Sequence, residues 1–278
     1  MLLLALVIHH FLVAVAVGDF VERTEFLTVS EGASVGTRLG RVNITSDLNY
    51  RLSTNNDYFD FDVDTGWVFL KTTIDRERIN GNGIEILLVS TTPPSILHIF
   101  ITVTDVNDNN PKFPLPYQNV SLIESSAIGT RVLLLSATDP DAGENGTIVE
   151  YAIENDIDQF DLIYNNHGLL YMELKQTLDR ERQERFVFNL SARDGGNPSR
   201  YGYTTVYVDV IDVNDNAPSF QSDELQTTWN GLASVPIMEL HAIDVDYGEN
   251  GRIVYDIPGT ESKYFMIDGN HLYARARN

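Results

Sequence analysis

The chain has 278 residues and a net charge of −21 at pH 7, from 40 acidic and 19 basic side chains. Such an excess of carboxylates repels phosphate backbones and anionic lipid surfaces, so nucleic acid and anionic membranes are excluded as partners and cations are the natural counter-charge. The chain contains no cysteine, so each domain must be stabilised by its own hydrophobic core and not by disulfides.

Residues 1–18 have the pattern of a signal peptide. The stretch 2–17 is apolar apart from two histidines, and small residues precede Asp19. Cleavage near Ala16 or Gly18 would release a secreted or extracellular chain; because no Lys or Arg precedes the apolar stretch, an uncleaved membrane anchor is the alternative. No later segment approaches the roughly 20 consecutive apolar residues of a membrane helix, so the mature chain is expected to meet a membrane only through an anchor C-terminal to this sequence.

After the leader, the periodicity of the sequence is that of β-strands. Alternate residues are apolar in 99–103 and again in 206–210, and the same alternation occurs in 133–137 and 238–242. No long segment has the 3.6-residue period of a helix. Many short strands separated by turn signals predict an all-β chain built from antiparallel β-sandwiches.

Short acidic sequence motifs, or words, recur in the chain in a fixed order. The word Asp105-Val106-Asn107-Asp108-Asn109 returns unchanged as Asp212-Val213-Asn214-Asp215-Asn216. Two other words recur with nearly the same spacing: Asp75-Arg76-Glu77 with Asp179-Arg180-Glu181, and Asp139-Pro140-Asp141 with Asp244-Val245-Asp246. This repetition predicts tandem domains. Their boundaries are expected to give a leader (1–18), a first repeat (19–109), a second repeat (110–216) and an incomplete third repeat (217–278).

The words at 105–109 and 212–216 are predicted calcium sites at the hinges between domains. Asp and Asn side chains at alternate positions, with backbone carbonyls between them, supply the hard oxygen donors that Ca²⁺ prefers. A simple turn is the alternative, because Asn and Asp form Asx-turns and a nearby proline suits a loop. Turns alone do not explain why all three acidic words recur with nearly the same spacing.

In this order, the words resemble the extracellular repeats of the cadherin superfamily. The resemblance rests on a glutamate near the repeat start, Asp-x-Asp, Asp-Arg-Glu, Asp-x-Gly and the junction word Asp-x-Asn-Asp-Asn, and it covers nearly the whole chain after the leader. It implies Greek-key β-sandwich repeats in a linear rod that Ca²⁺ stiffens at each junction. Residues 74–113 look more like the first repeat of a protocadherin, although Asn80-Gly81-Asn82-Gly83 stands where many protocadherins have a disulfide loop.

The resemblance also implies the metal ligands. Those of the first junction would be Glu31, Asp75, Glu77, Asp105, Val106, Asn107, Asp108, Asn109, Asp139, Asp141, Asn145 and Asp194. Those of the second would be Glu124, Asp179, Glu181, Asp212, Val213, Asn214, Asp215, Asn216, Asp244, Asp246 and Asn250. The counterpart of Asp194 in the third repeat, the aspartate of its Asp-x-Gly motif, would lie beyond Asn278, so the ion of the second junction nearest the third repeat is expected to bind weakly.

Three N-glycosylation acceptor motifs are predicted sites of modification, at Asn43, Asn119 and Asn189. A fourth match begins at Asn145. Its carbonyl is expected to ligate an ion, so Asn145 is expected to remain unmodified.

The resemblance implies calcium-dependent cell–cell adhesion, with another cadherin-family ectodomain as partner and homophilic pairing expected. The chain would then lie at the plasma membrane if it belongs to a longer anchored protein, and otherwise be secreted. Two alternatives are a secreted fragment that blocks its relatives and a calcium-stiffened spacer without self-recognition. An enzyme is not expected, because the acidic pairs recur at each junction and neither a Ser-His-Asp nor a zinc-ligand arrangement emerges.

Overall fold

The computed structural model describes residues 13–17, 20–42, 49–53, 56–79, 81, 83–155, 157–222, 225–228, 232 and 234–275. These residues form β-strands and two short 3-10 turns, η1 (Arg76–Arg78) and η2 (Gly259–Lys263), which confirms the all-β class. No helix in the described part of the chain has the length and apolar character needed to cross a membrane.

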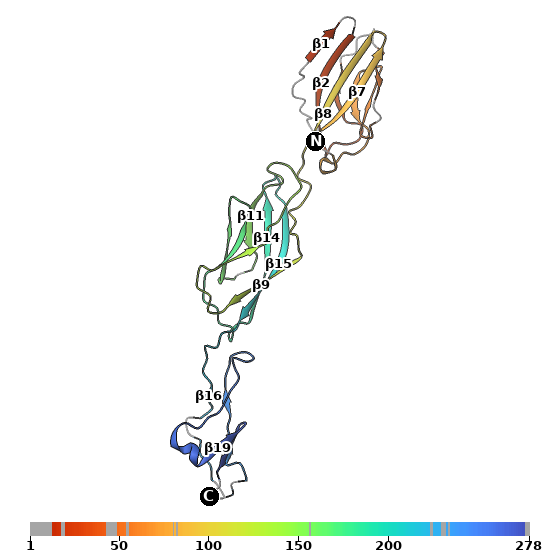
Figure 1. The fold of residues 1–278 in the computed structure, drawn as a ribbon. Helices are drawn as coiled ribbons and strands as arrows, with labels where there is room; N and C mark the ends of the chain where they lie inside the picture. The colour runs from red at the N-terminus through yellow and green to blue at the C-terminus, as the bar shows by residue number, and fades with distance from the viewer. Residues whose placement is uncertain are drawn as a thin grey trace. The chain divides into compact units, whose positions relative to one another are not determined.

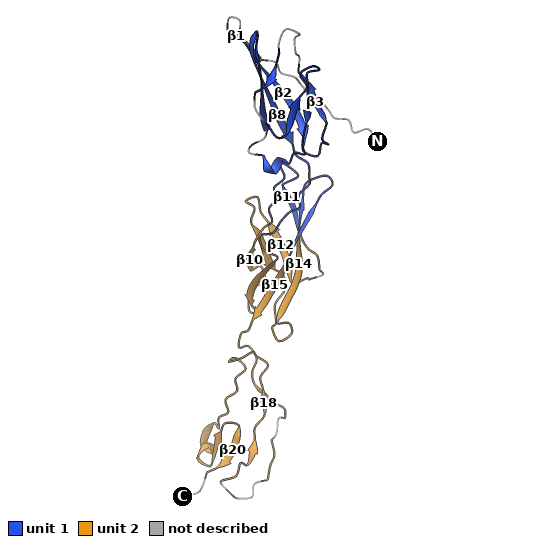
Figure 2. Ribbon diagram, turned by 90° about the vertical axis from the view of Figure 1, so that its right-hand side faces the viewer, with its two compact units in different colours: residues 1–113, 137–151, 192–203 blue, residues 114–136, 152–191, 204–278 orange. Residues whose placement is uncertain are grey.

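The chain divides into two compact units, shown in blue and orange in Figure 2. The first comprises residues 1–113, 137–151 and 192–203, and the second comprises 114–136, 152–191 and 204–278. All predicted ligands of the first junction belong to the first unit, and all those of the second junction belong to the second. Each site can therefore be described within one unit.

Two sheets form the first sandwich (Figure 1). One has the strand order β1-β2-β8-β7-β4 and the other β3-β6-β5. Their bounds are β1 (Val13–Val17), β2 (Phe20–Ser30), β3 (Arg38–Arg41), β4 (Arg51–Leu52), β5 (Phe59–Phe61), β6 (Trp67–Leu70), β7 (Gly83–Thr91) and β8 (Pro94–Thr104). Strand β1 falls within the predicted signal peptide, whose other residues lie outside the described part, so cleavage remains a prediction.

The core of the first sandwich follows the alternation of its strands. Ile99, Ile101 and Val103 of β8 are buried, as the period-two pattern predicts, and Ile86 and Leu88 of β7 face the same side. Burial of such side chains is the main source of stability for a domain without disulfides.

The second sandwich has the same design. One sheet has the order β11-β14-β15-β9 and the other β10-β13-β12. Their bounds are β9 (Tyr117–Ile123), β10 (Arg131–Leu134), β11 (Ile148–Ile153), β12 (Phe160–Tyr164), β13 (Leu170–Leu174), β14 (Arg185–Asp194) and β15 (Tyr201–Ile211). Strands β11, β14 and β15 contribute residues to both compact units.

Two strand pairs depart from the expected antiparallel pattern. Strands β2 and β8 pair in parallel from Val21↔Ser95 to Ser30↔Thr104, and β9 and β15 do so up to Ile123↔Ile211. Parallel partners end at the same edge of a sheet. The residue after β2 therefore lies beside the residue after β8, and this brings the start of a repeat next to its C-terminal linker.

The strands after residue 217 form smaller sheets, one of β16 and β18 and one in the order β17-β20-β19. Their bounds are β16 (Ser219–Phe220), β17 (Met238–Glu239), β18 (Ala242–Ile243), β19 (Phe265–Asp268) and β20 (His271–Ala274). Among the described residues of this segment, the buried hydrophobic side chains are Leu240 and Ala274.

Candidate metal sites

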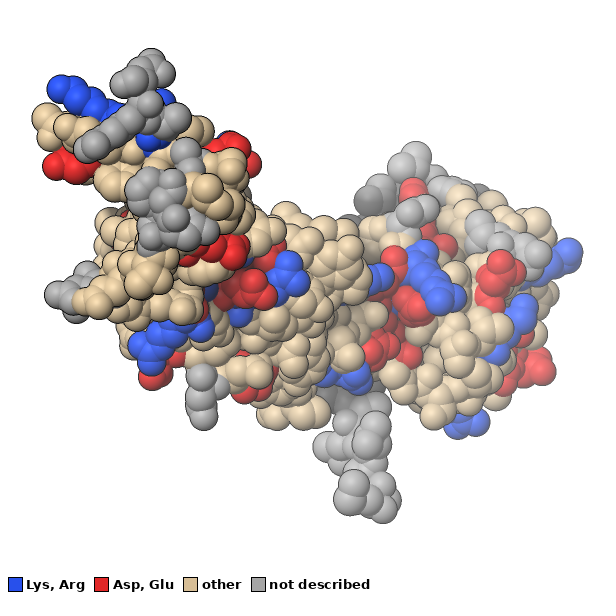
Figure 3. Space-filling model, turned by 90° about the horizontal axis from the view of Figure 1, so that it is seen from below, with Lys and Arg blue, Asp and Glu red and all other residues tan. Residues whose placement is uncertain are grey.

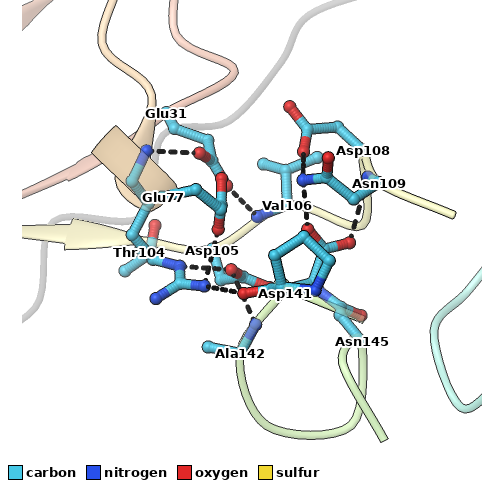
Figure 4. A network of polar contacts seen from close by, with 12 residues as sticks. Glu31, Glu77, Thr104, Asp105, Val106, Asp108, Asn109, Asp141, Ala142 and Asn145 are labelled. Atoms are coloured by element: carbon cyan, nitrogen blue, oxygen red, sulfur yellow. Dashed lines mark hydrogen bonds and ion pairs between the residues drawn. The ribbon is translucent and has the colours of Figure 1, made fainter. Parts of the chain in front are cut away.

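Glu31 is oriented by backbone groups of three other segments (Figure 4). Its N–H donates to the Thr104 carbonyl (3.1 Å), because β2 and β8 end side by side. Its carboxylate accepts the N–H of Arg76 at Oε2 and the N–H of Val106 at Oε1, both at 2.7 Å. The side chain is buried, so these contacts hold a carboxylate against both η1 and the linker.

Asp75 and Glu77 flank the first residue of η1 and bring two more carboxylates to Glu31. One oxygen from each of these three residues lies within 4.8 Å of the others. Glu77, Asp108 and Asp141 form a second group by the same measure. Because Glu77 belongs to both groups, its carboxylate can serve two adjacent cations.

Asp105 ties the linker to the loop that precedes β11. Its Oδ1 accepts the N–H of Ala142 (2.9 Å) and the Nε–H of Arg76, and its Oδ2 accepts the Nδ2–H of Asn145 (2.9 Å). Burial alone would raise the pKa of Asp105, but the hydrogen bonds from Asn145, Ala142 and Arg76 hold that pKa below its usual value. This carboxylate is therefore ionised at neutral pH.

Asn109 and Asp141 form a second tie between the linker and the same loop. The backbone N–H of Asn109 donates to Asp141 Oδ2 (3.1 Å) and its Nδ2–H donates to Oδ1 (2.6 Å). The side chain of Asn109 also donates to Asp108 (2.9 Å). The N–H of Asp141 in turn donates to Asp139 Oδ1 (3.0 Å), so the Asp-x-Asp word folds back on itself.

Among the described residues, two buried acceptors of the first cluster have neither a hydrogen-bond nor an ion-pair partner, Asn107 Oδ1 and Asp139 Oδ2, whereas Glu77 Oε1 lacks a hydrogen bond but pairs with Arg76. The Nδ2 of Asn107 donates to Pro198 O (2.8 Å) and to Asp194 Oδ1 (3.3 Å), which leaves its oxygen as the unused group. Asp194 is fully buried. A buried polar atom without a partner is costly, and a cation in the cluster would satisfy both oxygens.

The crowding of carboxylates changes their pKa values. Burial, followed by repulsion from Glu31, raises the pKa of Glu77 to about 7, against the attraction of Arg76. Burial also raises the pKa of Asp108 and of Asp139, with neighbouring carboxylates adding to the shift. These groups resist full ionisation in the absence of a cation.

The second cluster repeats the architecture of the first around Glu124. Its N–H donates to the Ile211 carbonyl (3.0 Å), because β9 and β15 end side by side. Its carboxylate accepts the N–H of Arg180 at Oε2 (2.7 Å) and of Val213 at Oε1 (2.6 Å). Glu124, Glu181 and Asp215 place oxygens within 4.8 Å of one another.

The linker and the loop after β18 complete this cluster. Asp212 accepts the N–H of Tyr247 (3.1 Å) and the Nδ2–H of Asn250 (2.7 Å). The Nδ2–H of Asn216 donates to Asp246 Oδ1 (2.7 Å). Glu181, Asp212 and Asp246 form the second group of oxygens within 4.8 Å, so Glu181 is shared as Glu77 is in the first cluster.

The pKa values of the second cluster follow the same pattern. Burial raises the pKa of Glu181 and of Asp215, and the carboxylate of Glu124 adds to both shifts. Burial alone would raise the pKa of Asp212. Hydrogen bonds, of which that from Asn250 has the largest effect, outweigh burial and lower this pKa.

Three predicted ligands of the second junction have protein partners of their own. Asp179 Oδ1 accepts the N–H of Arg182 (2.9 Å), and Asp244 Oδ1 accepts the N–H of Asp246 (3.0 Å). The carbonyl of Asn250 accepts the Nδ2–H of Asn214 (3.3 Å). Neither Asp179 nor Asp244 belongs to the carboxylate groups found among the described residues.

Two arginines lie at the clusters and were not singled out from the sequence. Arg76 contacts Glu77 Oε1 (2.6 Å) and donates to the Pro140 carbonyl (2.9 Å). Arg180 lies over the ring of Tyr247, 4.1 Å from its centroid. Each is the middle residue of an Asp-Arg-Glu word, which is the signal that could have identified it.

The predicted glycosylation sites differ in what surrounds them. Asn43 lies outside the described residues. Asn119 and Asn189 are exposed on β9 and β14. The Nδ2 of Asn145 donates to Asp105, which is consistent with the expectation that this asparagine remains unmodified.

The donor sets fit Ca²⁺. Both consist of carboxylate, amide and carbonyl oxygens, the ligands of a hard cation, without sulfur or imidazole. The acidic side chains (red in Figure 3) gather in groups on the face in view, and basic side chains (blue) lie beside several of these groups. At the first junction Arg76 pairs with Glu77 and Asp105, and Arg78 pairs with Asp75. The predicted carboxylate ligands outnumber these two cations, so negative charge remains in excess.

Comparison with known proteins identifies the repeats. Residues 21–105 match the model of a FAT4-like, N-terminal cadherin-like domain, and residues 118–211 match the cadherin domain. The chain belongs to the cadherin superfamily. It resembles the protocadherins within it, which confirms the resemblance drawn from the acidic words.

The relatives are longer proteins, of which this chain spans only a part. Cadherin-3 from Caenorhabditis elegans is 36% identical over 94% of this chain, which spans 8% of that protein. Human protocadherin alpha-11 is 30% identical over 90% of this chain, which spans 28% of it. The crystal structure of protocadherin gamma C5 EC1-3 superimposes with a TM-score of 0.77 and 30% identity, covering 90% of this chain and 88% of that one.

The cadherin and protocadherin families are adhesion proteins and not enzymes, which agrees with the expected class of function. Its similarity to cadherin ectodomains also indicates that the chain lies outside the cell or on the cell surface. Cadherin domains in general bind Ca²⁺ at repeat junctions.

Proposed function

We propose that both clusters bind Ca²⁺, and that calcium makes the chain a competent module for homophilic adhesion. The observation that carries this proposal is that both clusters are built from the same four kinds of segment. Each joins a strand end, an Asp-Arg-Glu turn, the linker and the Asp-x-Asp loop of the following repeat. A cation held by all four segments would restrict the hinge.

Electrostatic repulsion supports a calcium-dependent hinge. Like charges about 4 Å apart repel by roughly 1 kcal/mol in water and by more at lower effective dielectric. Ca²⁺ would supply the positive charge that the carboxylates of the two repeats share. Because an ordered hinge binds calcium and an open one does not, the ligand stabilises the ordered state by mass action.

The protein groups already prepare such a site. Glu31 and Glu124 are each held by two backbone N–H donors, so their carboxylates are positioned before any ion enters. Asp141 and Asp246 are positioned by the linker asparagines Asn109 and Asn216. Little ordering remains to be done on binding, which favours affinity.

An exposed aromatic surface on the first repeat supports self-recognition. Phe26 of β2 and Phe100 of β8 stack on the outer face of their sheet with ring centroids 5.6 Å apart, and they are 44% and 38% exposed. Exposed aromatic side chains are common anchors of protein interfaces. We infer that this face contributes to contact with a second cadherin-family ectodomain.

Calcium titration by calorimetry on the full chain tests the metal sites. The four carboxylate groups predict at least four ions per chain, bound with affinity that falls when the junction acids are neutralised. Small-angle scattering should give larger and better-defined dimensions in calcium than in chelator. Absence of binding, or identical dimensions in both conditions, would refute the proposal.

Sedimentation at increasing protein concentration tests homophily separately. Self-association in calcium that is lost in Phe100→Glu supports adhesion through the first repeat. Phe220 lies outside that face and is 46% exposed, so Phe220→Glu is the control substitution. A strict monomer that still binds calcium would support a calcium-stiffened spacer, and self-association unaffected by Phe100→Glu would place the contact elsewhere.

A further inference from the structure

A pair of tyrosines covers part of the outer face of the β14-β15-β9 region. Tyr117 of β9 is 53% exposed, and its ring meets that of Tyr207 of β15 edge to face, with centroids 6.1 Å apart. Both rings lie on the solvent side of the sheet, because the buried residues of these strands are the alternate ones. Large aromatic surface exposed on a sheet face usually has a covering partner.

Asn119 lies beside both rings. Residues 117 and 119 point to the same face because side chains alternate along a strand. In the parallel register, Asn119 pairs with Tyr207 and Tyr117 pairs with Thr205. Asn119 is exposed, and none of the hydrogen bonds found among the described residues uses its side-chain amide. The amide nitrogen is thus free at a point where two aromatic rings converge.

We propose that Asn119 carries an N-linked glycan whose first N-acetylglucosamine packs against Tyr117 and Tyr207. Asn119, Val120 and Ser121 form the acceptor motif, and Ser121 is exposed. In the transfer, the Asn119 amide nitrogen loses one proton and bonds to the anomeric carbon of a lipid-linked oligosaccharide, which releases its lipid pyrophosphate. The C–H face of a pyranose ring is apolar and complements the π face of an aromatic ring.

A second acceptor asparagine lies on the same face. Asn189 belongs to β14, on the other side of β15 from β9, and its Oδ1 accepts the hydroxyl of Thr205 (3.2 Å). The residue two positions before it is Val187, so no tyrosine precedes this site at the spacing found for Asn119. Asn189 is therefore a matched site on the same sheet without an aromatic residue at that position.

Glycans at these positions would cover the tyrosine face of the second repeat. A branched, hydrated oligosaccharide excludes a protein partner from the surface on which it lies. The outer face of β2-β8 in the first repeat, which carries Phe26 and Phe100, has no acceptor motif among its described residues. The two aromatic faces thus have different occupants: a covalent sugar on the second repeat and a protein partner on the first.

The test uses the full chain secreted from a eukaryotic cell and trimmed to single N-acetylglucosamine residues with an endoglycosidase. Mass spectrometry of peptides should show Asn119 occupied. Ser121→Ala, which removes the motif but keeps Asn119, should lower the unfolding midpoint of the second repeat by about 2–5 °C. In a Tyr207→Val background the same substitution should have little effect, while the effect of Asn189→Gln should be the same in both backgrounds.

A spectroscopic readout keeps the proposal testable if Tyr207→Val fails to fold. The acetyl methyl protons of the sugar on Asn119 should show an upfield ring-current shift in the trimmed glycoprotein, and this shift should be lost in Tyr117→Thr, which changes an exposed ring. An unmodified Asn119 would overturn the proposal. So would a sugar whose stabilising effect and chemical shifts do not depend on either tyrosine.

Discussion

Asp141 is the residue on which the linker and the loop of the second repeat converge. It is 7% exposed, accepts two hydrogen bonds from Asn109 and shares a group of oxygens with Glu77 and Asp108. Asp141→Ala is expected to lower calcium affinity at the first junction by about 10- to 100-fold, as measured by calorimetry. Asp161→Ala, an exposed acid on β12 outside both clusters, should leave the titration unchanged; equal effects of the two substitutions would contradict the assignment.

Glu77 predicts a pH dependence for the calcium-free chain. Its pKa of about 7, raised mainly by burial, lies above its ordinary value of 4.5. The folded state therefore retains a proton that the unfolded state has lost, and this contribution to stability falls as pH rises from about 4.5 to about 7.

The free energy of unfolding in calcium-free buffer, measured by denaturant titration between pH 5 and 8, should show this decrease. Glu77→Gln should flatten it, since the amide does not titrate. Glu154→Gln, at an exposed position, serves as the control. A slope of opposite sign that depends on Glu77 would show that its pKa is lowered.

The β14–β15 connection is the element that completes the first cluster. It brings buried Asp194 to the linker, where Gly196 packs directly against Asn107. A Cβ on Gly196 would lie 2.0 Å from Asn107 Nδ2, so any side chain there must displace Asn107. Glycine has no Cβ, so it alone leaves room for a neighbouring side chain this close to the backbone.

Gly196→Ala is accordingly expected to weaken calcium binding at the first junction by about tenfold or more, while the second junction keeps its affinity. Gly32→Ala provides a control beside the same cluster, because its added Cβ would meet Val106 Cγ2 at 3.4 Å, an ordinary contact. Calorimetry on both variants distinguishes them. If Gly196→Ala bound calcium with normal affinity, the observed position of Asn107 would not be required for the site.

The whole molecule carries a charge of −21, and its two acidic clusters concentrate part of it. Without calcium, added salt should screen this repulsion and raise the unfolding midpoint, because the Debye length falls from about 10 Å at 0.1 M to about 3 Å at 1 M. With calcium bound, the clusters are neutralised and the midpoint should depend much less on salt. Thermal unfolding in sodium chloride, with chelator or with calcium, measures this; equal salt effects in both conditions would contradict a role of the clusters in calcium-dependent stability.

The repeat pattern, the all-β class and the candidate oxygen donors were readable from the sequence, because each depends on local chemistry. Alternation of apolar residues specifies a strand, and the Asp/Asn words specify a hard-cation site wherever they lie. The parallel pairing of β2 with β8 and of β9 with β15 was not readable in this way, since it joins segments that no turn connects.

What only the tertiary structure decided is which of these groups meet. The parallel pairs place Glu31 beside Asp105 and Glu124 beside Asp212, and η1 places Arg76 among the carboxylates. The same pairing sets Asn119 next to Tyr207, far from it in the chain. A sequence specifies the donors because residue type determines chemistry; their assembly into a site depends on strand register, which only the packed sandwich determines.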